Sequence, residues 1–473
     1  MWKGVQAAAL AAVLSAAQVL AAEPAAAERI TLDEAIEGAL LHNLDLAQSA
    51  RDVQGNRLAA EAAQVRVVDF QVAPEGAAGA TDAGGDWQGG LRAGVTVPTG
   101  ARLEAVGLAR QIEVEGAADL RRQEVRVEIS QPLFRNFGPL VRNEPAVAAD
   151  ETWRAARRAW ERERSGLAVR VAECYESLIR LRRQIERDEA FAARIERLWA
   201  LADARERQGR TERTEVMRLD LQRGEAQMNL EARRAQLDIR SREFADLLGR
   251  PLDAVFLLVP PPLLDLDLPG PEQALATAMA GRPDYAQALD DILTADRQVL
   301  LARRDLWPDL SLTARHSTYG EGGDWSDAGR LDQEDWFVGI VGDVNLNRRS
   351  ARLDAERSEL EAEGRRQVAE LVRRQLAMEV HEALTQYRRD RSELVLAGRN
   401  RELAANRAEV ASALYEAGRG SADTVSDAEA DLLDAELSEL GARQAASLAA
   451  YRLLHVLGRL VPASPELLAG GPG

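Results

Sequence analysis

Two long segments with heptad spacing restrict the fold of this 473-residue chain more than any other feature. Apolar side chains recur there at alternating intervals of four and three residues, as in helices that pack along a shared seam. The first segment runs from about Glu144 to Arg207 and meets no proline after Pro145. A helix of about 64 residues would be roughly 95 Å long. The seam positions are Leu167, Val171, Cys174, Leu178, Leu181 and Ile185, and then Leu376, Val380, Ala383, Tyr387, Leu394 and Ala397.

Each long helix is expected to end near a glycine, Gly209 or Gly418, and a second helix to start behind Thr211 or Ser421. Glycine favours a helix C-terminus, and serine or threonine favours an N-cap. The sequence therefore predicts two antiparallel helical hairpins, over residues 144–248 and 349–459. A structural coiled coil, such as a rod or a tether, would show the same pattern.

The chain contains an internal repeat. Markers in residues 35–48 match residues 274–287 at an offset of 239, and markers in residues 171–250 match residues 380–459 at an offset of 209. These matches predict a first structural repeat over residues 28–250 and a second over residues 272–460. A proline-rich linker, residues 251–271, joins the repeats, and residues 461–473 are expected to form a flexible C-terminal tail.

Period-two alternation of apolar and polar residues predicts strands at about 68–135 and 309–347. The run Trp336, Val338, Ile340 alternates with Phe337, Gly339, Val341, and three other runs behave similarly. Such runs fit the strands of a membrane β-barrel, and equally a soluble sandwich with one wet face. Gly/Asp-rich residues 76–86 and 320–335 are expected to be loops. Four tryptophans at or beside strand ends are candidate membrane-interface aromatics: Trp87, Trp307, Trp325 and Trp336.

The number of strands bears on oligomeric state. Four to six strands per chain are too few to close a barrel, and an open sheet edge cannot face lipid, so several chains must share one barrel. With two strands per repeat, a trimer would hold 3 × 4 = 12. An extra hairpin over about residues 91–114, turning at Pro98-Thr99-Gly100, leaves this total open.

The first residues resemble an export signal, and composition narrows the function. Residues 1–22 show a positive start, an apolar stretch and small residues, which predicts a cleaved signal peptide rather than a membrane anchor.

A net charge of −17 argues against a nucleic-acid partner. One cysteine and four scattered histidines give no metal-ligand spacing, and no catalytic constellation or phosphate-binding loop appears, so neither an enzyme nor a cofactor is expected.

Several motifs together resemble the TolC family of outer-membrane efflux and secretion ducts. They are Leu32-Asp33-Glu34-Ala35-Ile36 with Asn43-Leu44-Asp45-Leu46, Arg282-Pro283-Asp284, Pro308-Asp309-Leu310-Ser311-Leu312, Ser130-Gln131-Pro132-Leu133-Phe134, and Tyr415-Glu416-Ala417-Gly418. The resemblance covers nearly the whole mature chain. It implies a mainly α-helical homotrimer, with a shared outer-membrane β-barrel that continues into a periplasmic α-barrel. It also implies outer-membrane lipid, a periplasmic adaptor (membrane fusion) protein and a proton-driven or ATP-driven inner-membrane pump as partners.

The same resemblance suggests residue roles at the periplasmic tip. Asp427 and Glu215 match acidic gate positions, while Thr424 stands where the family often has aspartate, with Asp423 beside it. The alternative is that these are exposed residues near helix N-termini. The tip turns that would contact an adaptor comprise Gly209, Arg210, Thr211, Gly418, Arg419, Gly420 and Ser421.

Three functions are compatible with the sequence. The leading interpretation is a passive exit duct of a tripartite efflux system for small molecules. The second is the outer-membrane duct of a type I protein secretion system. A third, of another class, is a periplasmic structural coiled-coil protein.

Overall fold

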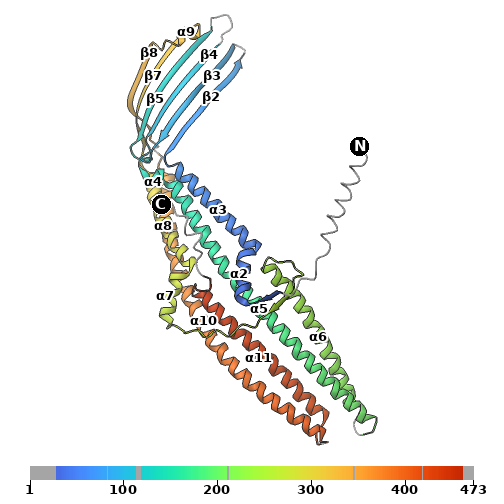
Figure 1. The fold of residues 1–473 in the computed structure, drawn as a ribbon. Helices are drawn as coiled ribbons and strands as arrows, with labels where there is room; N and C mark the ends of the chain where they lie inside the picture. Colours follow the sequence, from blue (N-terminus) through green and yellow to red (C-terminus); the bar gives the residue numbers. More distant parts are fainter. Residues whose placement is uncertain are drawn as a thin grey trace, which may run out of the picture. The chain divides into compact units, whose positions relative to one another are not determined.

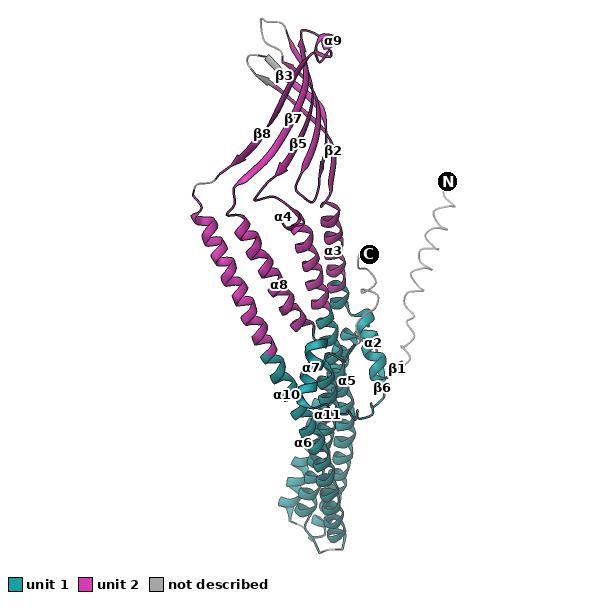
Figure 2. Cartoon of the chain, turned by 90° about the vertical axis from the view of Figure 1, so that its left-hand side faces the viewer, with its two compact units in different colours: residues 1–48, 161–282, 374–473 teal, residues 49–160, 283–373 magenta. Residues whose placement is uncertain are grey.

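The computed structural model describes residues 28–81, 84–112, 119–209, 212–344, 347–417 and 419–461. The signal peptide expected at residues 1–22 and all but the first residue of the tail expected at residues 461–473 lie outside these ranges. The chain divides into two compact units (Figure 2). Unit 1 comprises residues 1–48, 161–282 and 374–473, and unit 2 comprises residues 49–160 and 283–373.

The order of elements follows the internal repeat (Figure 1). The first half contains β1 (Glu28–Ile30), α2 (Leu32–His42), α3 (Leu44–Val65), β2 (Asp69–Thr81), β3 (Gly84–Thr96), β4 (Arg102–Ile112), β5 (Leu120–Pro132), α4 (Pro139–Arg142), α5 (Glu144–Glu206) and α6 (Arg213–Leu247). The second contains β6 (Phe256–Leu258), α7 (Pro271–Gly281), α8 (Pro283–Arg304), β7 (Asp309–Gly322), α9 (Trp325–Ala328), β8 (Gln333–Asp343), α10 (Arg349–Glu416) and α11 (Ala422–Val456). The chain is thus mainly helical with a β part, as expected.

The long helices bury the seam that their heptad spacing predicts. In α5, Leu167 and Val171 are fully buried and Leu178 is 1% exposed. In α10, Leu376 and Val380 are 3% and 2% exposed. Burial of such an apolar stripe supplies most of the stability of a long helix. Among the described residues, no helix has the length and apolar character needed to cross a membrane.

Tyrosine hydroxyls fix the segment between the repeats to the long helices. The Tyr175 hydroxyl oxygen lies 2.9 Å from the Ile30 carbonyl oxygen and accepts a hydrogen bond from the Val259 amide at 3.0 Å. On the other long helix, the Tyr387 hydroxyl accepts from the Leu266 amide at 3.0 Å. The parallel pair β1 and β6 lies in the same unit. The proline-rich residues 251–271 are therefore attached to α5 at Val259 and to α10 at Leu266.

The lone cysteine is a packing residue. Cys174 is 8% exposed on the α5 seam, and its thiol lies 3.6 Å from the Arg240 carbonyl oxygen. Burial raises the pKa of this thiol to about 11. A protonated, buried thiol is a poor nucleophile.

Unit 2 contains a six-stranded antiparallel sheet in the order β2-β3-β4-β5-β7-β8. Its strands divide unevenly between the repeats, because β2 to β5 come from the first half and β7 and β8 from the second. The expectation of two strands per repeat is therefore wrong for the first half, where the optional extra hairpin is present as β3 and β4. The loop expected at residues 76–86 is also wrong, since β2 extends to Thr81 and β3 starts at Gly84.

Candidate functional site

The two helical hairpins of unit 1 end in turns that differ in their construction. After α5, Gly209 adopts a φ of 70°, a left-handed conformation that favours glycine, and its amide donates to the Glu206 carbonyl at 2.7 Å. After α10, the Arg419 amide donates to the Leu414 carbonyl at 2.9 Å. A Cβ atom added to Gly420 would lie 3.3 Å from the Tyr415 backbone nitrogen, so this turn leaves little room for a side chain there. The candidates Arg210, Thr211 and Gly418 lie outside the described residues, and the residue that precedes α6 is Glu212.

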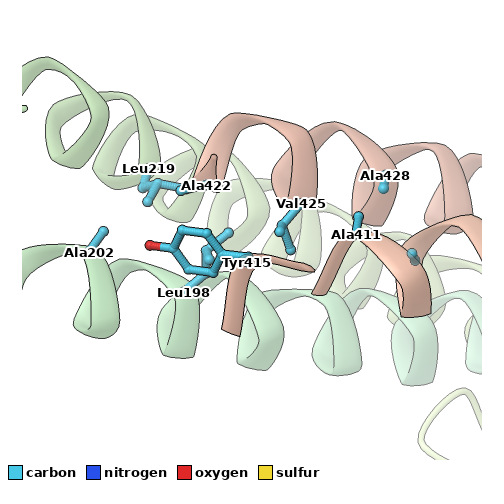
Figure 3. Packing of buried hydrophobic residues seen from close by; sticks show 9 residues of the cluster. Leu198, Ala202, Leu219, Ala411, Tyr415, Ala422, Val425 and Ala428 are labelled. Carbon is cyan, nitrogen blue, oxygen red and sulfur yellow. The ribbon is translucent and has the colours of Figure 1, made fainter. Parts of the chain in front are cut away.

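A small apolar cluster joins the ends of all four helices (Figure 3). Its central aromatic side chain is Tyr415, which is 4% exposed. The Arg205 guanidinium lies 4.2 Å from the centre of the Tyr415 ring, a cation–π contact. Burial raises the pKa of the Tyr415 hydroxyl. The cluster consists of Leu198, Ala202, Leu219, Ala408, Ala411, Tyr415, Ala422, Val425 and Ala428.

Two side chains satisfy the first amides of α11. The Ser421 hydroxyl accepts from the Thr424 amide at 3.3 Å, as an N-cap does. The Glu215 carboxylate accepts from the Ala422 amide at 2.9 Å. A carboxylate is favourable at this position because the N-terminus of a helix is electropositive. The candidate gate residue Glu215 therefore links the start of α6 to the start of α11.

The remaining gate candidates occupy different environments. Asp423 forms an ion pair with Arg218 of α6. The Thr424 hydroxyl lies 2.9 Å from the Ser421 hydroxyl and belongs to the cap. Asp427 is exposed, and no residue in the described part of the chain forms a hydrogen bond or ion pair with its side chain. Of the three acidic candidates, Asp427 alone presents an unpaired carboxylate.

Sequence reasoning missed the polar contacts that connect the hairpins. Arg194 on α5 pairs with Glu429 on α11, and Arg187 pairs with Glu436 at 3.1 Å. These partners are more than 200 positions apart in the chain, so no local spacing signals them. The two arginines are seven residues apart, about two helical turns, and so are the two glutamates. This match becomes visible only after α5 and α11 are placed side by side.

The sheet of unit 2 has one apolar face. Its register aligns Phe70, Leu103, Ile129 and Val338 in one row across the strands. Large apolar side chains on this face are 41% to 75% exposed. They are Phe70, Val72, Trp87, Leu91, Leu103, Val125, Val127, Ile129, Leu312, Trp336, Val338 and Ile340. A contiguous apolar surface of this extent marks an interaction with lipid or protein.

The opposite face carries most of the charged side chains of the sheet. Arg92 pairs with Glu75 at 2.6 Å and with Glu104 at 3.4 Å, so one arginine connects β2, β3 and β4. The Arg110–Asp86 pair, at 2.7 Å, joins β3 and β4 again. The alternation predicted from sequence thus separates an apolar from a charged face.

The four candidate tryptophans lie at three levels of the sheet. Trp87 and Trp325 meet edge to face, with ring centres 6.0 Å apart, at the end of the sheet that holds α9 (Figure 1). Trp307 precedes β7 at the other end and contacts Phe134, with ring centres 6.4 Å apart. Trp336 lies within β8 and is 75% exposed on the apolar face.

The comparisons with known proteins agree with this architecture. Residues 274–459 match the family described as outer membrane efflux protein. That match covers 186 of the 473 residues and lies in the second half of the chain. The outer-membrane channel OprN is 17% identical, with 90% of this chain and 89% of that one covered and a TM-score of 0.70. The Campylobacter jejuni CmeC outer membrane channel is 14% identical, with 93% of this chain and 88% of that one covered and a TM-score of 0.72. The outer membrane protein VceC from Vibrio cholerae is 16% identical, with 90% of this chain and 96% of that one covered and a TM-score of 0.69.

Comparison with curated proteins finds no match. The solved structures that share this fold are outer-membrane channels and proteins. Among the described residues, no three potential metal ligands gather in one place. The two features of interest are therefore the hairpin ends of unit 1 and the two-faced sheet of unit 2.

Proposed function

We propose that this chain is the passive exit duct of a tripartite efflux system, working as a homotrimer in the outer membrane with a large periplasmic part. A periplasmic adaptor protein and an inner-membrane pump, driven by protons or by ATP, would complete the system. The adaptor would contact the hairpin ends around Gly209, Arg419, Gly420 and Ser421, together with Arg210, Thr211 and Gly418. The four tryptophans Trp87, Trp307, Trp325 and Trp336 would lie against lipid at or near the membrane interfaces.

The one-sided sheet is the observation that carries this proposal. Each square ångström of apolar surface left in water costs about 25 cal/mol, so a dozen large exposed side chains need a cover. Lipid covers them without a partner protein. The strands β2 and β8 are sheet edges, and unpaired backbone groups cannot remain in lipid. Edge-to-edge pairing between copies closes the sheet and satisfies both edges.

The helical part offers a second surface for contact between copies. On α6, Met217, Leu221 and Met228 are 58%, 70% and 67% exposed. On α10, Leu396, Leu403 and Val410 follow heptad spacing and are 58%, 63% and 59% exposed. Apolar side chains at such spacing pack into the holes of a facing helix. These stripes are suited to helix packing between neighbouring copies.

The test is extraction and mass measurement of the full chain expressed in a Gram-negative host. We expect the protein in the outer-membrane fraction, released only by detergent, with the mass of a trimer. A water-soluble monomer in the periplasm would contradict the duct and would favour the structural coiled-coil alternative. The secretion-duct alternative predicts the same fractionation. Deletion of the gene distinguishes the two ducts. Loss of an efflux duct should increase drug susceptibility, whereas loss of a secretion duct should abolish the export of a polypeptide.

We propose Asp427 as the principal acidic gate residue, because its carboxylate is exposed and unpaired. Three copies around the tunnel axis would attract cations. Asp427→Ala should lower the cation preference of the channel severalfold, since about 1 kcal/mol of ion binding changes occupancy about fivefold. The measurement is the reversal potential in a salt gradient. Asp253→Ala removes an equal charge from an exposed position between the repeats and should leave the preference unchanged. Equal effects of both variants would contradict the assignment.

In the same proposal, Glu215, Asp423 and Thr424 have supporting roles at the gate. Glu215 and Thr424 hold the start of α11, and Asp423 ties it to Arg218. Neutralising Asp423 would leave Arg218 unpaired beside the Asp427 ring. We therefore expect Asp423→Ala to lower cation preference through the freed arginine, and Arg218→Ala to raise it.

A further inference from the structure

The hairpin formed by β3 and β4 has no counterpart among the described residues of the second half of the chain. Helices α2 and α3 repeat as α7 and α8 at an offset of 239, whereas α6 repeats as α11 at an offset of 209. The first half is therefore longer by 239 − 209 = 30 residues between these markers. The hairpin spans residues 84–112, which accounts for nearly all of this difference. It is an insertion into one of two otherwise similar halves.

The inserted hairpin is a full part of the sheet rather than a flap upon it. β3 pairs with β2, and β4 pairs with β5, each in continuous antiparallel register (Figure 1). The turn between β3 and β4 is closed by a hydrogen bond from the Gly100 amide to the Val97 carbonyl at 2.8 Å. The Thr99 carbonyl accepts from the Gly138 amide at 2.9 Å, which fixes the turn to the chain that follows β5.

The hairpin also continues both faces of the sheet. Leu91 and Leu103 are 55% and 44% exposed on the apolar face. On the charged face, Arg92 and Arg110 form the ion pairs with Glu75, Glu104 and Asp86 described above. A hollow of about 620 Å³ on this face is lined in part by Arg92, Arg102, Glu104 and Glu128. The inserted strands therefore place apolar and charged side chains on the same faces of the sheet as the neighbouring strands do.

We propose that the hairpin widens the outer exit of the duct, so that the closed sheet of a trimer contains 3 × 6 = 18 strands instead of the 12 that the internal repeat alone would give. This inference rests on the proposed trimeric duct. At a strand spacing of about 4.8 Å and a tilt of about 40°, the backbone radius is roughly 18 Å for 18 strands and roughly 12 Å for 12. Sheets of 16 to 18 strands enclose an aqueous channel. The exit therefore admits bulky, hydrated solutes, and the sheet is not the size filter of the duct.

The register provides a clean deletion to test this proposal. Asp69, Thr96, Arg102 and Ser130 form one row across β2, β3, β4 and β5. Removing residues 84–112 brings Asp69 opposite Ser130 with the same face inward, and residues 82–83 and 113–118 remain to connect β2 with β5. The variant should form a 12-stranded trimer. Polyethylene glycols of graded size, added to the side of a planar bilayer that faces the α9 end, should enter the full chain up to a radius about 1.5-fold larger than in the variant.

Strand counting in the full chain makes the test independent of whether the deletion variant folds. Cryo-electron microscopy of the detergent-extracted trimer should show 18 strands, with β2 of one copy beside β8 of the next. A 12-stranded ring with the hairpin outside it, or equal polymer radii for both proteins, would overturn the proposal. Failure of the full chain to form trimers or to enter a bilayer would instead overturn the proposed duct.

A matched pair of substitutions tests which face of the hairpin meets lipid. Leu91→Arg places a charge on the apolar face of β3 and should reduce trimer in the outer membrane at least tenfold. Gly94→Arg places the same charge on the other face, directly opposite Glu104, where it gains an acidic partner. It should preserve the trimer. Equal trimer yields from the two variants would place the hairpin outside the ring and contradict the wide exit.

Discussion

Replacing Val72 with arginine is expected to remove most of the assembled trimer from the outer membrane. Val72 is 53% exposed on the apolar face of β2, in a row with Val127 and Trp336. An arginine on the lipid face of a membrane-spanning sheet costs about 2–4 kcal/mol at the bilayer midplane and about 0–1 kcal/mol near an interface, so in the row of Trp336 the cost lies between these limits. In the proposed trimer this cost would recur in each of the three copies. The measurement is the yield of trimer in the outer-membrane fraction, on gels run without boiling.

The neighbouring residue supplies the control. Gln71 lies on the opposite face of the same strand, and its amide donates to the Asp69 carboxylate at 2.6 Å. In Gln71→Arg, an ion pair with Asp69 would replace that hydrogen bond, so the trimer should assemble as in the unmodified chain. A normal yield from Val72→Arg, or an equal loss from both variants, would contradict the assignment of the apolar face to lipid.

Tyr415→Ala is expected to loosen the hairpin ends and to open the mouth of the proposed duct more often. Truncating a buried aromatic side chain typically costs 3–5 kcal/mol, and this one also removes the cation–π contact with Arg205. The cluster is small, so few other contacts compensate. Amide hydrogen exchange should accelerate in residues 408–417 and 422–428. Single-channel recordings should show more frequent openings, and cells should become more sensitive to bulky antibiotics.

Tyr415→Phe is the matched control for this effect. It keeps the ring beneath the Arg205 guanidinium and removes only the hydroxyl, so exchange and opening frequency should remain close to those of the unmodified protein. If Tyr415→Ala exchanged as slowly as the unmodified chain, the cluster would not be what holds the hairpin ends together. If Tyr415→Phe opened as often as Tyr415→Ala, and both more often than the unmodified protein, the hydroxyl rather than the ring would hold the hairpin ends together.

The helical part of the fold was predictable because heptad spacing is a local signal. The seam through Leu167 and Val171, and its repeat through Leu376 and Val380, predicts the long helices from sequence spacing alone. Part of the sheet was predictable for the same reason, since strands such as Gln333–Asp343 alternate clearly. β2 was not, because residues 74–81 consist mainly of small residues whose alternation carries little hydrophobic contrast. Their small side chains therefore favour a loop in the sequence, whereas pairing with β3 makes them part of a strand.

The candidate gate was only partly predictable. Sequence spacing placed Glu215, Asp423 and Asp427 near helix starts, but it could not distinguish a paired from an unpaired carboxylate. Arg218, which pairs with Asp423, lies 205 positions earlier in the chain. The Ala422 amide, which donates to Glu215, is equally remote in sequence. Only the packing of α6 against α11 determines which acidic group remains available at the surface.

The burial of Cys174 has a practical consequence for measuring motion in this protein. With the thiol packed on the seam and its pKa near 11, less than about a thousandth of it is thiolate at neutral pH. Thiol-directed probes therefore have no accessible native target. The unmodified chain can serve as its own background for single introduced cysteines at the hairpin ends or along the sheet edges. Spin labels and fluorophores placed there would report distances between copies without first removing a core residue.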